Sequence, residues 1–286
     1  MKTPVVMRSR NDMPLVEKTL AALRTQDLPL ELVSFDNEST DGTTAAVRAQ
    51  ADRVHTVPAG TYVPGRVLNQ AMAATAGEVV VFVNADCTPQ DSQWLRALIA
   101  PFQDQRVAAT FGRQIPRPGC WRLYARDTEN TFGDGLQQRR WRHCFSMAAS
   151  AVRRSVWAAL PFREDLTYSE DIDWTWRVRQ QGHTLQYVPE AVAMHSHNYT
   201  PAQLYRRQYG EGRAEAAIFA WTAWEASLLR YSLLPCARQL LGDWRYCLRR
   251  GALGAALAAP VLRLAQGAGR RRGFGVGRRE RRQNSP

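Results

Sequence analysis

Short apolar runs alternate with helical patterns through residues 1–86, and no other feature limits the fold of this chain as strongly. Three runs have the length and the apolar or β-branched character of buried strands: Pro4–Met7, Glu31–Phe35 and Glu78–Val83. The segments between them have helical spacing: Leu15–Leu23, Thr43–Ala51 and Gly65–Ala76. Strands and helices that alternate in this way form βαβ units with right-handed crossovers. The sequence therefore predicts an α/β fold, with a Rossmann-like, mostly parallel central sheet flanked by helices.

Further along the chain the pattern is less even. Strands are expected at Val107–Phe111 and Ser146–Val152, and two short ones at Thr184–Val188 and Ala191–His195, separated by Pro189. Residues 112–142 read as a less regular stretch, and Glu170–Gln181 as a helix. From Pro201 onward the sequence favours long helices and offers no strand.

Polar residues follow the first three predicted strands. Ligands of parallel α/β sheets bind beyond the carboxyl ends of the strands, which here are residues 8–12, 36–41 and 84–86. No GxGxxG follows the first strand, and no GxxxxGK[ST] occurs, so dinucleotide-binding Rossmann domains and P-loop NTPases are excluded. A phosphate bound here would have to be held by groups other than a glycine-rich loop.

Asp86 is the first candidate for chemistry, since it follows a buried apolar run. Such a carboxylate is either a loop or helix-capping acid or a ligand for a hard divalent cation. His195 and His197 lie two residues apart at a predicted strand end, so both rings can point the same way. Two histidines at this spacing are often only polar residues on the surface. Together with Asp86 from another strand end, they could form a metal site.

Glu170 and Asp171 are adjacent acids at the start of a predicted helix. Acids in a first turn are favoured by the helix dipole and need no other explanation. Two neighbouring carboxylates can also tune a catalytic base through mutual repulsion. The spacing alone leaves both interpretations open.

Charge divides the chain unevenly. Of its 286 residues, 38 are Lys or Arg and 26 are Asp or Glu, and almost all of the excess of +12 lies after residue 200. This asymmetry, with a Gly/Arg-rich end, predicts three parts: a catalytic domain over 1–200, a helical region over 201–266 and a basic, disordered tail over 267–286. The ordinary charge of the first part argues against a nucleic-acid partner.

No apolar run reaches the length of a membrane-spanning helix, and the polar start leaves no room for a secretory signal. Five cysteines without a CxxC pair indicate a reduced, cytoplasmic protein. The C-terminal aromatic and arginine residues suit either a packed helical subdomain or a surface that lies on an anionic membrane.

The motifs resemble, in type and order, those of family 2 glycosyltransferases with the GT-A fold, from about Val5 to Ala216. The matching segments include VVMRSRND, LVSFDNESTDGT, YVPGRVLNQAMAATAGEVVVFVNADCTP and FSMAASAVRRSVWAALPF. The later segment YSEDIDWTWRVRQQGHTLQYVPEAVAMHSHNYT is most similar to the bacterial rhamnosyltransferase-like branch.

The resemblance implies a role for each matching position. Asp86 would be the metal-binding acid of the DxD equivalent and His195 a further ligand, for Mg²⁺ or Mn²⁺. Asp171 would be the general base, with Glu170 beside it. The residues expected at the nucleotide sugar are Arg8, Arg10, Asp36, Arg66, Asn69, Asn84 and Ala85. Asn84 stands where the family has the first Asp of DxD, and Met147 and Ala149 stand where it has amides.

The implied function is an inverting, metal-dependent glycosyltransferase. It would move rhamnose or another hexose from a dTDP- or UDP-linked donor to a glycan or lipid-linked acceptor, on the inner face of the cytoplasmic membrane. One alternative, a nucleotidyltransferase, lacks its phosphate signature near the first strand. Another is a non-catalytic or nucleic-acid-binding protein that uses the arginine-rich tail.

Overall fold

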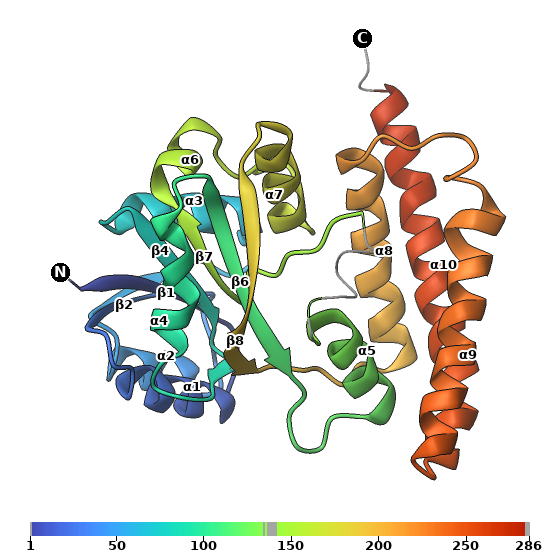
Figure 1. Cartoon of the computed structure of the whole chain (residues 1–286), viewed down its shortest axis with the longest axis horizontal. Coiled ribbons are helices and arrows are strands. Elements are labelled where there is room, and N and C mark those ends of the chain that lie inside the picture. Colours follow the sequence, from blue (N-terminus) through green and yellow to red (C-terminus); the bar gives the residue numbers. More distant parts are fainter. Residues whose placement is uncertain (1, 134, 136–141, 284–286) are drawn as a thin grey trace. The chain divides into compact units, whose positions relative to one another are not determined.

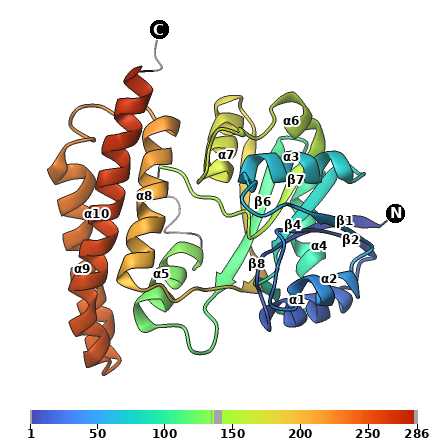
Figure 2. The ribbon, with the colours of Figure 1, turned by 180° about the vertical axis from the view of Figure 1, so that it is seen from behind.

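The computed structural model describes residues 2–133, 135 and 142–283 (Figures 1 and 2). The chain divides into two compact units. The sheet unit comprises Met1–Arg117, Thr128–Leu166 and Glu170–Ser196. The helical unit comprises Pro118–Asp127, Thr167–Ser169 and His197–Pro286. The main part of the helical unit begins at His197, and two short segments from earlier in the chain join it.

One sheet organises the sheet unit, in the order β3-β2-β1-β4-β7-β6-β8-β5. Its strands are β1 (Thr3–Ser9), β2 (Leu30–Asp36), β3 (Arg53–Thr56), β4 (Val79–Asn84), β5 (Thr88–Pro89), β6 (Val107–Ile115), β7 (Ala149–Arg153) and β8 (Thr184–Met194). Strands β1 to β4 are mutually parallel, whereas β7 runs antiparallel to both of its neighbours. The predicted mostly parallel sheet is confirmed in its first half.

Alternating side chains fill a core on each face of the sheet. Val5 and Met7 of β1 point into one core, and Val6 between them points into the other. The first core is covered by α1 (Leu15–Arg24), α2 (Thr43–Arg48) and α4 (Trp94–Ile99), the last followed by the 3₁₀ turn η1 (Ala100–Gln103). The second is covered by α3 (Pro64–Ala74), α6 (Arg154–Ala159) and α7 (Glu170–Gln180).

Strand β8 corrects one prediction. The two short strands expected around Pro189 are one strand, Thr184–Met194. Its pairing with β6 slips between Gly112 and Arg113, where the partner jumps from Val188 to Val192. This irregularity absorbs the proline, which has no N–H to donate, without ending the strand. A side chain at Gly112 would collide with the carbonyl of Ala191, so the slip needs glycine there.

The sequence analysis did not predict two of the strands and one of the helices. Strands β3 and β5 are too short to show a clear alternation. Helix α5 (Arg122–Phe132) lies in the stretch that was read as irregular. Its polar sequence RLYARDTENTF buries only Leu123 and Ala125, which leaves little apolar periodicity to detect. Part of that stretch, residues 134 and 136–141, lies outside the described residues.

Helices α8 (Pro201–Ile218), α9 (Leu234–Arg249) and α10 (Leu253–Gln283) run side by side in the helical unit, with a π-helical turn η3 (Leu229–Leu233) before α9 (Figures 1 and 2). The disorder predicted for the tail is wrong for residues 267–283, which form the end of α10. Residues 284–286 of that prediction lie outside the described residues.

Glycines explain why this tail is helical. Gly269, Gly273 and Gly277 recur every fourth residue, and a Cβ on any of them would collide with a backbone carbonyl of α8. Their absent side chains let the two helix backbones approach closely. Arg270 adds a 2.7 Å ion pair to Glu215 of α8. The pattern that reads as low complexity is therefore a packing surface.

Candidate active site

A tight turn after β4 positions Asp86. Cys87 N donates to the carbonyl of Asn84 over 2.9 Å, and Ala85 N donates to the carbonyl of Arg8 over 2.9 Å. The turn is therefore fastened to the end of β1. The carboxylate of Asp86 is nearly buried, since the residue is 8% exposed.

His195 follows β8 and meets Asp86 from the other half of the sheet. Its Nε2 lies 3.5 Å from Asp86 Oδ1. Its Nδ1 is 2.7 Å from Oε1 of buried Gln114. The amide Nε2 of Gln114 donates to Ser146 Oγ over 2.9 Å, which fixes its Oε1 as the acceptor. The Nδ1 proton therefore points to Gln114, and the Nε2 lone pair faces Asp86.

These two side chains suit a divalent cation. A carboxylate oxygen that faces an imidazole nitrogen at this distance is satisfied either by a proton on that nitrogen or by a bound cation. Ligands at about 2.1 Å from an octahedral ion lie about 3 Å apart when adjacent, so the 3.5 Å separation of Asp86 Oδ1 and His195 Nε2 is close to what one ion requires. The carboxylate suits Mg²⁺ or Mn²⁺, and the imidazole favours a transition-metal ion such as Mn²⁺ over Mg²⁺.

Arg117 belongs to the same site, and the sequence analysis did not single it out. It follows β6, and its Nη2 lies 3.0 Å from Asp86 Oδ2. The same nitrogen also donates to the backbone carbonyl of Asp86. Asp12 lies near Asp86. Burial raises the pKa of Asp12 to about 6, and the negative charges of Asp86 and Asp41 add to this effect. In the sequence, Arg117 is one of two arginines shortly after the predicted strand Val107–Phe111, and nothing distinguishes it from Arg113.

Glu170 and Asp171 begin α7. Asp171 accepts backbone hydrogen bonds at both oxygens, from Met147 N at 3.1 Å and from Ile172 N at 2.8 Å. Burial raises the pKa of Asp171, against the lowering effect of these two bonds. Burial and the neighbouring Asp171 likewise raise the pKa of Glu170, and Arg8 opposes them. Both groups are thus less acidic than an exposed carboxylic acid, as a proton acceptor at neutral pH should be.

Arg8 connects the start of α7 to the end of β4. Its Nη2 donates to Asn84 Oδ1 over 2.9 Å, and its Nη1 lies 3.6 Å from Glu170 Oε1. Arg8 and Asn84 are direct neighbours in the pairing of β1 with β4. The side chain of Asn84 therefore holds an arginine. Because Asp86 is two residues away, Arg8 links the start of α7 to the turn that carries Asp86.

A known family has this sequence pattern. Residues 5–158 match the profile of Glycosyl transferase family 2.

The chain belongs to this family.

Curated relatives of this family 2 glycosyltransferase include two bacterial enzymes. It is 30% identical over 195 residues to the O-antigen chain rhamnosyltransferase WbaN of Salmonella anatum, a match that covers 64% of this chain and 62% of the relative. It is 27% identical over 225 residues to the O-antigen chain rhamnosyltransferase RfbN of Salmonella typhimurium, with 74% and 72% covered. The predicted likeness to bacterial rhamnosyltransferases is confirmed.

Solved structures show the GT-A fold. The mannosyltransferase PcManGT of Pyrobaculum calidifontis, in complex with GDP-Man and Mn²⁺, matches 94% of this chain and 85% of its own, with a TM-score of 0.65 at 21% identity. Glucosyl-3-phosphoglycerate synthase of Mycobacterium tuberculosis, with Mn²⁺, UDP and phosphoglyceric acid, matches 78% and 80%, with a TM-score of 0.57 at 20% identity. The predicted fold class is confirmed.

The carboxylate of Asp36 is buried and forms hydrogen bonds within the protein. It is 1% exposed and accepts hydrogen bonds from Ser9, Ser39 and Thr44 hydroxyls at 2.6–2.7 Å. Burial works to raise the pKa of Asp36, but these hydroxyl bonds lower it below its usual value. The carboxylate organises the loop after β2. Its predicted contact with the nucleotide stays a prediction.

Arg66 and Asn69 hold the segment that leads toward α7. Asn69 Nδ2 donates to the carbonyl of Phe162 and to Glu164 Oε1, both at 3.0 Å, and Arg66 Nε lies 3.2 Å from Glu164 Oε2. Gly65 is required because a Cβ there would collide with the carbonyl of Arg163. The GRxxN motif therefore acts as a clamp between α3 and this segment, and direct nucleotide contact stays a prediction.

Two further predicted residues directly follow strands, Arg10 after β1 and Ala85 after β4. Ala85 is buried at the Asp86 turn. Arg10 is exposed, and its backbone N donates to Asp12 Oδ2 over 2.8 Å. Of the predicted residues, the structure brings together six around the Asp86 turn and the start of α7: Arg8, Asn84, Asp86, Glu170, Asp171 and His195.

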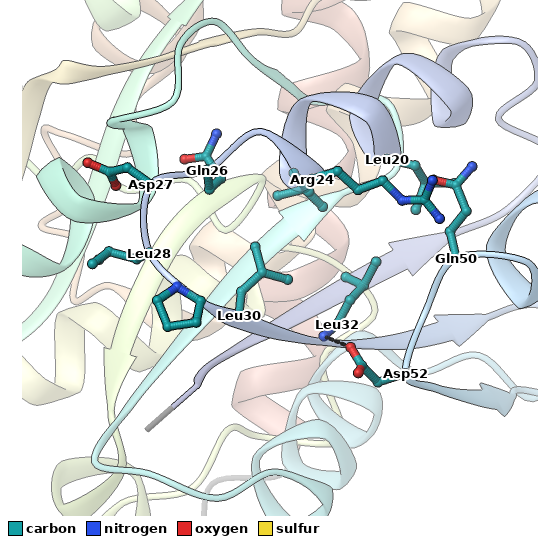
Figure 3. A pocket seen from close by; sticks show the side chains of 11 residues that line it. Leu20, Arg24, Gln26, Asp27, Leu28, Leu30, Leu32, Gln50 and Asp52 are labelled. Atoms are coloured by element: carbon teal, nitrogen blue, oxygen red, sulfur yellow. Dashed lines mark hydrogen bonds between the residues drawn. The ribbon is translucent and has the colours of Figure 1, made fainter.

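A cavity of about 320 Å³ lies elsewhere in the sheet unit (Figure 3). Leu30 and Leu32 at the start of β2 line it, together with Leu20 and Arg24 of α1. Asp36 marks the opposite end of the same strand. The cavity is therefore at the edge of the sheet away from Asp86 and is not part of the candidate active site.

Proposed function

We propose that this family 2 glycosyltransferase is a metal-dependent, inverting hexosyltransferase. The observation that carries the proposal is the pairing of two different carboxylate sites at one edge of the sheet. Asp86 faces His195 at 3.5 Å, and Glu170 lies 3.6 Å from Arg8, which also holds Asn84. Transfer from a nucleotide diphosphate sugar requires two elements: a site for a cation and a buried carboxylate that can act as a general base.

Asp86 and His195 would hold the divalent cation. When bound there, the ion supplies Lewis-acid neutralisation of the departing diphosphate. Arg117 keeps Asp86 in place, and Arg8 supplies a fixed positive charge between the two halves of the site.

Asp171 is the proposed general base. Its raised pKa suits it to take the proton of the acceptor hydroxyl as that oxygen attacks the anomeric carbon. The attack comes from the face opposite the diphosphate, so one displacement inverts the anomeric centre. One carboxylate is sufficient, and no covalent glycosyl-enzyme is needed. Glu170 lies beside it, and the charge of Asp171 adds to burial in raising the pKa of Glu170.

Relatives suggest the substrates. Two relatives are O-antigen chain rhamnosyltransferases, which supports rhamnose, or another hexose, as the transferred sugar. We propose a dTDP- or UDP-linked donor and a glycan or lipid-linked acceptor of the cell envelope, with the enzyme at the cytoplasmic face of the membrane. The GDP-Man and UDP complexes of the fold neighbours support a nucleotide-sugar donor of some kind.

A thermal-shift panel of nucleotide diphosphates with Mn²⁺, Mg²⁺ or a chelator tests the donor site. We expect stabilisation by one nucleotide only when the cation is present, and its loss in Asp86→Asn. Asp171→Asn should keep this stabilisation and lower transfer by roughly 10²–10⁴-fold. An Asp171→Asn enzyme that still transfers at the wild-type rate would identify another base.

The alternative of a nucleic-acid-binding tail has less support, since arginines of α10 are used within the protein. Arg270 pairs with Glu215, and Arg271 and Arg281 donate to backbone carbonyls. Strong, salt-sensitive RNA binding would favour that alternative.

A further inference from the structure

The helical unit carries an exposed apolar surface on η3, α9 and the first half of α10. We call this surface the leucine face. Its residues are between 39% exposed (Trp244) and 81% exposed (Leu257). They are Leu228, Leu229, Leu233, Leu241, Trp244, Leu248, Leu253, Leu257, Val261 and Leu264. Single exposed leucines are ordinary, but a run of this size on adjacent helices indicates a binding surface.

The spacing shows that the leucine face is a separate side of each helix. Leu241, Trp244 and Leu248 recur at helical spacing on α9, and the members on α10 do the same from Leu253 to Leu264. The inner sides of these helices are already packed. Asp243 and Cys247 of α9 are buried, as are Ala259, Leu262 and Arg263 of α10. Much of the apolar surface of the leucine face therefore lies outside the core of the unit.

The charges beside the leucine face have one sign. Five exposed arginines lie among its members: Arg230, Arg238, Arg245, Arg249 and Arg250. Asp243 is the only acidic residue between Glu225 and Glu280, and it is fully buried. Two copies of such a face would bring like charges together, which disfavours a dimer through it. An apolar face with a cationic rim instead complements an anionic, amphipathic surface.

We propose that the leucine face binds the surface of an anionic phospholipid bilayer. Trp244 and the leucines would enter to the depth of the headgroups and upper acyl chains, and the arginines would contact lipid phosphates. Over residues 2–133, 135 and 142–283, no helix is long and apolar enough to cross a membrane, so these helices would lie along it. The contact is thus made by η3, α9 and early α10, and the arginine-rich end of the chain is not its main part.

This inference deepens the proposed function and rests on its membrane location. It is tested without donor or acceptor, so vesicle binding and sugar transfer can fail separately. The full chain is centrifuged with vesicles of phosphatidylcholine alone, or of phosphatidylcholine with phosphatidylglycerol, at low and high salt. Circular dichroism and size-exclusion chromatography with light scattering verify the fold and the oligomeric state of each variant.

Three variants divide the surface. Leu241→Gln, Leu248→Gln and Leu257→Gln together should lower binding to anionic vesicles by roughly tenfold or more, because apolar contact is lost. Arg238→Gln, Arg245→Gln and Arg249→Gln together should lower the same binding and reduce its salt dependence. Arg279→Gln with Arg282→Gln, at the exposed end of α10, is the control for loss of positive charge elsewhere and should bind nearly as the wild type does.

Three outcomes would overturn the proposal. The first is wild-type binding that is absent or equal for both vesicle types. The second is a folded leucine variant that binds like the wild type. The third is a leucine variant that converts a dimer to a monomer, with no vesicle binding by the wild type, which would make the face a contact between copies.

Discussion

Arg117 holds Asp86 at two points, through its carboxylate at 3.0 Å and through its backbone carbonyl. The backbone N of Arg117 also bonds Ser196 Oγ at 3.0 Å, directly after His195. One arginine therefore sets the position of Asp86 relative to His195. Residues that orient metal ligands in this way contribute to affinity without touching the ion.

Replacing Arg117 tests this role. Arg117→Gln removes the ion pair and frees the Asp86 turn, so we expect the apparent affinity for Mn²⁺ to fall roughly 10–100-fold. The affinity is measured from the Mn²⁺ dependence of thermal stabilisation and of transfer. Arg113→Gln, at an exposed arginine on β6 four residues earlier, is the control and should leave this affinity unchanged. Unaltered Mn²⁺ affinity in Arg117→Gln would contradict the role.

His143 makes the fold sensitive to acid. Its Nδ1 accepts from Arg179 Nη1 at 3.1 Å, so the proton of the neutral ring is on Nε2, which donates to Thr175 Oγ1 at 2.6 Å. Burial, with Arg179 nearby, lowers the pKa of His143 from 6.5 to about 4. Between these values the unfolded chain binds a proton that the folded chain excludes, so stability falls as the pH falls from 6.5 to about 4.

The loss attributable to His143 is up to about 3 kcal/mol. Urea unfolding of the wild type and of His143→Gln at several pH values measures it. The variant should be less stable than the wild type at pH 7, and the gap should narrow toward pH 4. Parallel stability curves for the two proteins would show that His143 does not titrate in this window.

The sheet and much of the site were predictable because they depend on local patterns. The apolar runs of β1, β2 and β4 fixed the strand ends, and with them Arg8, Asn84 and Asp86. Side-chain partners from distant segments could not be predicted. Nothing in the sequence indicates that Arg117 pairs with Asp86, or that Asn69 forms hydrogen bonds with the segment before α7. The tail was misjudged for a related reason: a glycine in a helix has value only when another helix lies against it.

Asp243 is the buried centre of the helical unit. It accepts from Arg263 Nε at 2.7 Å and from Arg126 Nη1 at 2.8 Å, and none of it is exposed. Asp243→Asn removes this carboxylate from two largely buried guanidinium groups, which retain Asp127 as an ion-pair partner, and should lower the free energy of unfolding by up to about 3 kcal/mol. Chemical denaturation measures this loss. Asp104→Asn breaks an exposed pair with Arg106 and should cost far less; equal losses would mean that burial does not matter here.

Two neighbouring glycines of α10 should respond in opposite ways to the same substitution. A Cβ at Gly273 would collide with the carbonyl of Tyr209 on α8, whereas a Cβ at Gly275 meets nothing within 4 Å. Gly275→Ala should therefore stabilise the protein by up to about 1 kcal/mol, because alanine favours the helix. Gly273→Ala has the same helical gain but forces α8 and α10 apart, and should destabilise the protein by about 1–3 kcal/mol.

Thermal and urea unfolding of both variants, with far-ultraviolet circular dichroism, provide the measurement. If residues 267–283 were disordered in solution, both substitutions would leave stability nearly unchanged, or both would raise helix content alike. A difference of opposite sign between positions 273 and 275 requires α10 to be packed on α8 with Gly273 facing inward, as the close approach of the two backbones demands.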